Sequence, residues 1–199
     1  MPINVQAEVV NIRSDTPKPD DAFLVDSNVW YWLTYPKASV SAKSYQINDY
    51  PLYISKSLSA KSLLSYSGFS LAELAHLIEK AEREFFNTSI SPKDYRHNYP
   101  AERANVVAEV QSVWSQVKTI AVPINLTIDE STTDAALTRF QNQQLDGYDL
   151  FILETMKKEG IDNVITDDGD YITVSGIRVF TSNQNAITAA RNQGKLLVR

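Results

Sequence analysis

Short apolar runs that alternate with helical segments are the feature that most constrains the fold of this 199-residue chain. Residues 23–25, 119–122, 163–166 and 177–180 are short, mostly apolar runs of the kind that forms buried strands. Helices are expected at residues 28–35, 71–81, 101–117, 132–142, 147–159 and 184–191, from apolar spacing and from helix start and stop signals. Because strands that alternate with helices build parallel sheets, the sequence predicts an α/β fold with a central parallel sheet.

Two further segments complete the predicted organisation. Residues 3–12 partly alternate and could form an additional strand, and residues 13–21 are rich in Pro and Asp, which indicates a linker. We therefore expect an N-terminal arm or extra strand with a linker over residues 1–20, followed by one domain over residues 21–199. Residues 37–68 are rich in Ser, Lys and Tyr, and short helices with a loop are expected there.

The composition favours carboxylates as the side chains that would carry any chemistry of this protein. The chain has no cysteine, which excludes disulfides, thiolate catalysis and cysteine-ligated zinc, and which fits a cytoplasmic protein. It has only two histidines, no apolar stretch long enough for a membrane span, and no apolar core of a signal peptide at its N-terminus. The net charge of −5 excludes bulk attraction to nucleic acid, although a local basic patch would remain compatible with it.

Acidic residues stand where predicted strands end and predicted helices begin. They are Asp26 after residues 23–25; Asp167, Asp168 and Asp170 after residues 163–166; Glu73 in the first turn of one helix; and Asp149 in the first turn of another, one turn after Asp146. In open α/β sheets, ligands bind beyond the carboxyl ends of the strands. We therefore expect these acids to gather at that edge.

Acids gathered without basic partners repel one another unless cations neutralise them. Carboxylate oxygens suit Mg²⁺ or Mn²⁺, and two such ions about 4 Å apart activate water and stabilise the leaving oxygen in phosphodiester cleavage. Each acid also has an ordinary structural explanation. Glu73 could pair with Ser70 in a capping box, Asp149 could complement a helix dipole, and the run from Asp167 to Asp170 could be a turn.

Four stretches in order resemble the PIN domain, the nuclease fold of VapC-like toxins and of several RNA-processing enzymes. "FLVDSNVW" is similar to the hydrophobic-D-[ST]-N-hydrophobic start of that family, and "SLAELAHL" to its [ST]-x-x-E-L helix. "GYDLFILETMKKEG" is similar to its D-A-hydrophobic helix, and "VITDDGDY" to its T-x-D-x-D-[FY] loop. The resemblance covers about residues 23–180 and implies a three-layer PIN-like sandwich around the parallel sheet.

The resemblance also implies roles for single residues. It makes Asp26, Glu73, Asp149 and Asp168 the catalytic acidic quartet that holds Mg²⁺ or Mn²⁺, with Asp170 as an additional acid of the last loop. It implies that Asn28 supports Asp26 by hydrogen bonding and that Thr166 lines the site. From their positions in the sequence, Asp146 and Asp167 are expected to be supporting residues. Asp168 is preferred to Asp167 because of its spacing to Tyr171.

The implied function is metal-dependent cleavage of RNA, in the setting of a toxin with an antitoxin partner and a homodimeric assembly. The basic and aromatic segment 37–68 could hold RNA through Lys43, Lys56 and Lys61, or could be a solvated surface. Two alternatives stay open. One is a catalytically inactive PIN-like module that binds RNA or protein, and the other is a nuclease that acts on DNA.

Overall fold

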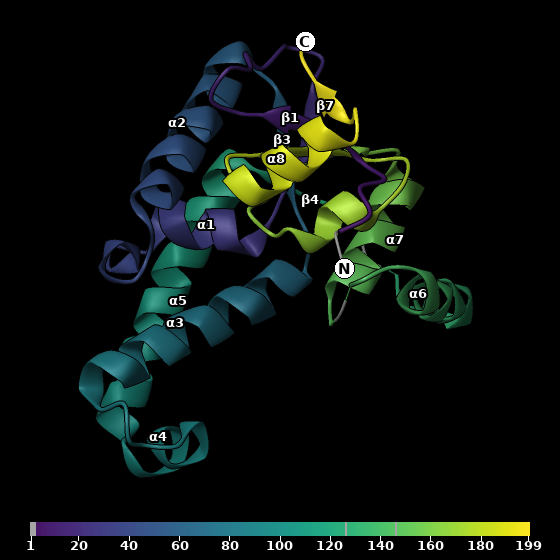
Figure 1. Cartoon of the computed structure of the whole chain (residues 1–199). Coiled ribbons are helices and arrows are strands. Elements are labelled where there is room, and N and C mark those ends of the chain that lie inside the picture. Colours follow the sequence, from purple (N-terminus) through teal and green to yellow (C-terminus); the bar gives the residue numbers. More distant parts are fainter. Residues whose placement is uncertain (1–2, 126, 146) are drawn as a thin grey trace.

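A seven-stranded, entirely parallel sheet forms the centre of the protein in a computed structural model, which describes residues 3–125, 127–145 and 147–199 (Figure 1). In the order in which they lie side by side, the strands are β4 (Val122–Pro123), β3 (Leu63–Tyr66), β2 (Ala22–Val25), β5 (Asn163–Ile165), β6 (Arg178–Thr181), β1 (Glu8–Asn11) and β7 (Leu196–Leu197). The helices are α1 (Ser27–Thr34), α2 (Ser44–Ala60), α3 (Phe69–Phe86), α4 (Pro92–Asn98), α5 (Pro100–Ile120), α6 (Glu130–Asn142), α7 (Asp149–Glu159) and α8 (Gln184–Asn192), with short 3₁₀ turns at Ala38–Val40 and Asp170–Thr173.

Each face of the sheet carries its own apolar core. Successive residues of a strand point to opposite faces. Accordingly, Phe23 and Val25 of β2 pack into one core with α1, α2, α3 and α5, whereas Leu24 packs into another with α7 and α8. Val164 and Ile165 of β5 divide between the two cores in the same way. Helices thus cover both faces, and the predicted α/β fold with a central parallel sheet in three layers is confirmed.

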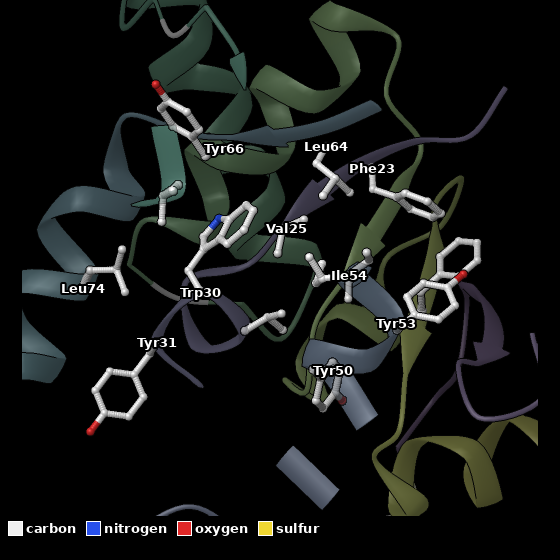
Figure 2. Packing of buried hydrophobic residues seen from close by; sticks show 14 of the residues in the cluster. Phe23, Val25, Trp30, Tyr31, Tyr50, Tyr53, Ile54, Leu64, Tyr66 and Leu74 are labelled. Carbon is white, nitrogen blue, oxygen red and sulfur yellow. The ribbon is translucent and has the colours of Figure 1, made fainter. Parts of the chain in front are cut away.

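The first core is strongly aromatic and fixes α1 and α2 against the sheet. Trp30 of α1 and Tyr50 of α2 are fully buried. Figure 2 shows the ring of Phe23 close to that of Tyr53, and their centroids are 6.1 Å apart in an edge-on arrangement. Aromatic side chains bury large areas, so these contacts hold the start of α1 firmly at the end of β2.

The segment 37–68 differs from the prediction of short helices and a loop. It forms the 17-residue helix α2, which contains Pro51, and then strand β3. Proline costs a helix a hydrogen bond, but Tyr50, Tyr53, Ile54 and Ser57 recur at helical spacing and are buried. Packing of that face outweighs the local penalty, which a single-sequence pattern does not reveal.

Smaller differences occur elsewhere. Residues 119 and 120, predicted to begin a strand, end α5 instead, and β4 is only Val122–Pro123. Helix α4 and strand β7 have no counterpart in the prediction because both are very short. Figure 1 shows α3 and α5 extending together away from the sheet, with α4 at their far end.

The N-terminal segment belongs to the same sheet as the rest of the chain. β1 lies between β6 and β7 and pairs with both. Beyond β1, Asp15 and Asp21 accept hydrogen bonds at 2.6 to 2.9 Å from the guanidinium of Arg199. The side chains of Asp15, Asp21 and Arg199 are 2%, 8% and 12% exposed, so this ion-pair network is largely dry.

Replacing Arg199 with Ala should therefore destabilise the fold. The substitution leaves two buried carboxylates without their cation, a change that costs on the order of 3 kcal/mol. Urea unfolding followed by circular dichroism measures the effect. Arg191→Ala, which alters an exposed cation of α8, is the matched control. Equal unfolding free energies for the two variants would show that the network contributes no net stability.

Candidate functional site

The site begins where β2 and β5 end side by side. The register pairs Val25 with Ile165, so the next residues, Asp26 and Thr166, are neighbours. The Thr166 hydroxyl donates to Asp26 Oδ2 at 2.5 Å, and the Asn28 amide donates to the same oxygen at 2.7 Å. The Asp26 Oδ1 atom caps α1 by accepting from the backbone N–H of Ser27 at 2.6 Å. Asp26 is therefore a buried carboxylate held by three donors, and its bond from Asn28 is the contact that the resemblance implied.

Glu73 lies across from this pair and is not part of a capping box. Helix α3 begins at Phe69 with Gly68 as its N-cap and without a side-chain cap, so Ser70 is a buried residue inside the first turn. Glu73 Oε2 instead accepts a hydrogen bond from the hydroxyl of Ser27. The capping interpretation of Glu73 is thus wrong, and its carboxylate is tied to the start of α1.

Asp149 is the first residue of α7, where a carboxylate also complements the helix dipole. Its Oδ1 accepts a hydrogen bond of 2.6 Å from the hydroxyl of Tyr171, which is fully buried. Burial and the surrounding acids Asp26 and Asp149 raise the pKa of Tyr171 well above its usual value. Tyr171 therefore stays protonated and donates to Asp149.

The structure separates Asp168 from Asp167. Asp168 lines the cleft described below, and its backbone N–H donates to Thr166 Oγ1 at 2.9 Å. Asp167 turns to α2, where it accepts hydrogen bonds from Tyr45, Gln46 and Tyr50 at 2.7 to 2.9 Å. Asp167 therefore anchors the loop after β5, whereas Asp168 is the acid presented to the cleft.

An open cleft of about 860 Å³ brings the four acids of the predicted quartet together. Its lining includes Asp26, Glu73, Asp149 and Asp168. Asp170 is exposed and is absent from the described lining; its backbone N–H donates to Asp168 Oδ1 at 2.8 Å. Asp146 lies outside the described residues.

The structure does not bring Lys43, Lys56 and Lys61 to the cleft. The 17 residues of α2 separate Lys43 from Lys61, a length of about 25 Å at 1.5 Å per residue. Lys56 borders a different and smaller pocket, beside Arg13 and Asp49. Segment 37–68 therefore presents no compact basic surface built from these three lysines.

Burial and mutual repulsion raise the pKa values of two of these acids, Asp26 and Glu73. Burial, followed by repulsion from Glu73 and Asp168, raises the pKa of Asp26 to about 7, despite the opposing hydrogen bonds from Thr166 and Ser27. Burial and repulsion from Asp149 and Asp168 raise the pKa of Glu73 to about 6. No Lys or Arg within the described ranges forms an ion pair with Asp26, Glu73 or Asp168.

The donor set fits a hard divalent cation in its chemistry. Carboxylates face the cleft, and the buried Asn28 Oδ1 has no hydrogen-bond partner among the described atoms. Oxygen donors of this kind are what Mg²⁺ and Mn²⁺ prefer. Nevertheless, in the described part of the chain no three Asp, Glu, His or Cys residues form a group that could hold an ion as placed. Binding an ion would therefore require the acidic side chains to converge.

Several lining residues have no counterpart in the sequence prediction. Ser27 lies inside the recognised "VDSN" stretch, but its bond to Glu73 depends on how α1 meets α3. Tyr148, Arg96 and Arg103 also line the cleft, and they come from three different helical regions. Tyr148 lies directly before α7, inside a stretch in which the sequence singles out Asp149 alone. Nothing in the local sequence marks Arg96 and Arg103, because only the packing of α4 and α5 on α3 brings them to the cleft.

Comparisons with known proteins leave the family open. No protein-family model matches the chain, and no curated protein matches its sequence. Within the described residues, no helix combines the length and the apolar character that crossing a membrane requires. The assignment of chemistry to this site therefore depends on its own geometry.

The raised pKa values predict that the metal-free protein loses stability as pH rises from about 4 to about 7. Over that range the unfolded chain has released the protons of these acids, while the folded protein still retains them. Mn²⁺ should therefore raise the melting temperature more at pH 7.5 than at pH 5. In Glu73→Gln, the fall in melting temperature between pH 5 and pH 7.5 should be smaller than in the wild type, and so should the rise caused by Mn²⁺. Each difference should amount to about 3 °C or more.

Differential scanning fluorimetry in EDTA and in Mn²⁺ measures these shifts. Asp134→Asn, which removes an exposed acid from α6, is the control and should behave like the wild type. A Mn²⁺ shift of equal size in Glu73→Gln and wild type would exclude Glu73 from the metal site.

Proposed function

We propose that this protein is a PIN-like, Mg²⁺- or Mn²⁺-dependent endoribonuclease. The single observation that supports this most strongly is that Asp26, Glu73, Asp149 and Asp168 all line one cleft at the carboxyl edge of a parallel sheet. Mutually repelling acids at such an edge favour a divalent cation, and the cleft that they line is open to solvent.

The four acids would hold the ion, with Asn28 Oδ1 as an additional oxygen donor nearby. A bound divalent ion supplies an activated water and neutralises charge on the phosphodiester. The protein's own groups orient the acids. Thr166 donates to Asp26 and accepts from the backbone N–H of Asp168, so that one hydroxyl links the ends of β2 and β5.

Glu73 has one oxygen available for a cation. Its Oε2 is bound by the Ser27 hydroxyl, while its Oε1 accepts no hydrogen bond from the described residues. Without an ion, burial and the neighbouring acids raise the pKa of Glu73 to about 6. Binding of a cation would lower this pKa, so that Glu73 would hold the ion as a charged carboxylate.

A non-catalytic PIN-like module that binds RNA or protein is the competing proposal. The observation that favours it is that the acids do not form a ready-made metal group among the described residues. The two functions differ in one measurable property, since only the nuclease breaks phosphodiester bonds.

Purified protein with Mn²⁺ should cleave a labelled single-stranded RNA, and EDTA should abolish the cleavage. Asp26→Asn and Glu73→Gln should each reduce the rate at least about 100-fold, because each removes a charged oxygen from the metal site. Denaturing gels of time courses measure the rates. Asp134→Asn, remote from the cleft on α6, should cleave normally. Folded protein that binds Mn²⁺ but cleaves neither RNA nor DNA would favour the binding module, and cleavage of DNA alone would change the substrate class.

Asp168 and Asp167 should respond differently to the same substitution. Asp168→Asn should abolish cleavage while leaving the melting temperature almost unchanged or higher, since it relieves repulsion in the cleft. Asp167→Asn should lower the melting temperature, since Asp167 is the acceptor for Tyr45, Gln46 and Tyr50, and should retain part of the activity. Rates and melting curves of the two variants test the assignment, and the reverse pattern would exchange their roles.

A further inference from the structure

The end of the cleft farther along α3 is basic. Arg96 of α4 and Arg103 of α5 both line it, and their side chains are 46% and 47% exposed. Both contact Glu79 of α3, which is only 8% exposed: Arg96 Nε donates to it at 2.6 and 2.8 Å, and Arg103 Nη1 at 3.0 Å. One buried carboxylate thus holds two guanidinium groups side by side at the cleft.

This cluster carries an excess of positive charge and unused donors. Glu79 neutralises one of the two arginines, which leaves a net charge of +1. Neither Nη atom of Arg96, and neither Nε nor Nη2 of Arg103, has an acceptor among the described residues. Guanidinium groups with free N–H donors match the geometry of a phosphate. Arg96 and Arg103 therefore form a preorganised site for an anionic oxygen group.

The lining also presents an aromatic ring, near the start of α3. Tyr148, directly before Asp149, is 43% exposed and lines the cleft. Its ring stacks on that of Phe69, with centroids 4.7 Å apart and planes 23° apart, and Phe69 in turn contacts Phe151. An exposed ring fixed by a partner behind it is suited to stacking with a nucleobase.

The acids and the arginines are arranged along one helix. Glu73 and Glu79 are six positions apart on α3, about 9 Å along its axis at 1.5 Å per residue. Both line the same cleft, so a polymer lying along α3 would meet the acidic group and the basic cluster in succession. A mononucleotide or free phosphate would not use both ends.

We propose that Arg96 and Arg103 bind a backbone phosphate of the substrate while Tyr148 stacks with one of its bases, so that the protein selects single-stranded RNA. A duplex keeps its bases paired and stacked, and therefore offers no free base to Tyr148. This inference rests on the proposed function for the identity of the polymer as RNA. It adds that the RNA is single-stranded, and it names the residues that would distinguish a single strand from a duplex.

Binding of a fluorescent single-stranded RNA to the Asp26→Asn protein in Mg²⁺ separates recognition from cleavage. Arg96→Gln with Arg103→Gln should weaken binding about tenfold and reduce the slope of log affinity against log salt by about 0.7, the loss of one phosphate contact. Lysine at both positions should restore most of that slope. Lys56→Gln with Lys61→Gln removes the same charge away from the cleft and should change affinity less than twofold.

Tyr148 is tested on the same background. Tyr148→Leu should weaken binding of single-stranded RNA about fivefold or more, whereas Tyr148→Phe keeps the ring and should bind like the parent. Neither change should affect binding of a duplex. Melting temperatures of all variants identify loss of folding, and the lysine and phenylalanine variants keep the test interpretable if Arg96→Gln or Tyr148→Leu folds poorly.

The outcomes distinguish this inference from the proposed function. The inference would be overturned if the two double-Gln variants had equal affinities for single-stranded RNA. It would also be overturned if duplex and single-stranded RNA bound equally well, or if the protein bound no RNA at all. If the arginine and tyrosine variants weaken binding but wild-type protein never cleaves RNA, the inference holds and the nuclease proposal fails. If wild-type protein cleaves RNA and its KM is unaffected in both sets of variants, the nuclease proposal holds and this inference fails.

Discussion

The pairing of β2 with β5 is the constraint on which the carboxyl edge depends. Backbone Asp26 N donates to Ile165 O at 3.0 Å, which places the side chain of Asp26 beside Thr166. A slip of one residue would turn each side chain to the opposite face. Because both faces of these strands are apolar, hydrophobicity alone does not exclude the slip. The polar contacts at the strand ends, together with the different side-chain shapes of the two cores, fix the register and hence the site.

The hydrogen bonds to Asp26 offset part of the free-energy cost of burying its carboxylate. Folding removes the Asp26 carboxylate from water and places it near Glu73 and Asp168, which is unfavourable for a charged group. Three hydrogen bonds stabilise the charged form but do not restore an ordinary pKa. A site that remains unfavourable for its own charges has a stronger driving force to take up a cation than one already balanced by Lys or Arg. The residual repulsion therefore supports a binding role more than a structural one.

The sequence predicts the strands and acids well where the signal is local, and less well where partners come from distant segments. The strand that ends at Val25 is predictable from the sequence, and so is the importance of the acid after it, because an apolar run changes to a charged residue within a few positions. Helix α2 is not predictable in the same way. Pro51 and the many serines argue against a long helix, and the buried face of α2 becomes evident only when the helix packs against the sheet. Asp167 and Asp168 are equivalent in sequence, and only the donors from α2, more than 115 residues away, distinguish them. The arginines of the cleft likewise depend on how α4 and α5 pack on α3.

Under the proposed function, the protein would have to bind a polyanion through local charge, because its net charge of −5 repels such a ligand at long range. Helix α3 contributes residues both to the core and to the cleft. Leu74 and Ile78 of this helix are buried in the core, while Glu73 and Glu79 reach the cleft. Glu73 belongs to the group that favours a cation, and Glu79 holds a pair of arginines that exceeds its own charge. Under the proposed function, this one helix would attract an anionic backbone at two places: at Glu73 once the acids hold a cation, and at the two arginines that Glu79 holds.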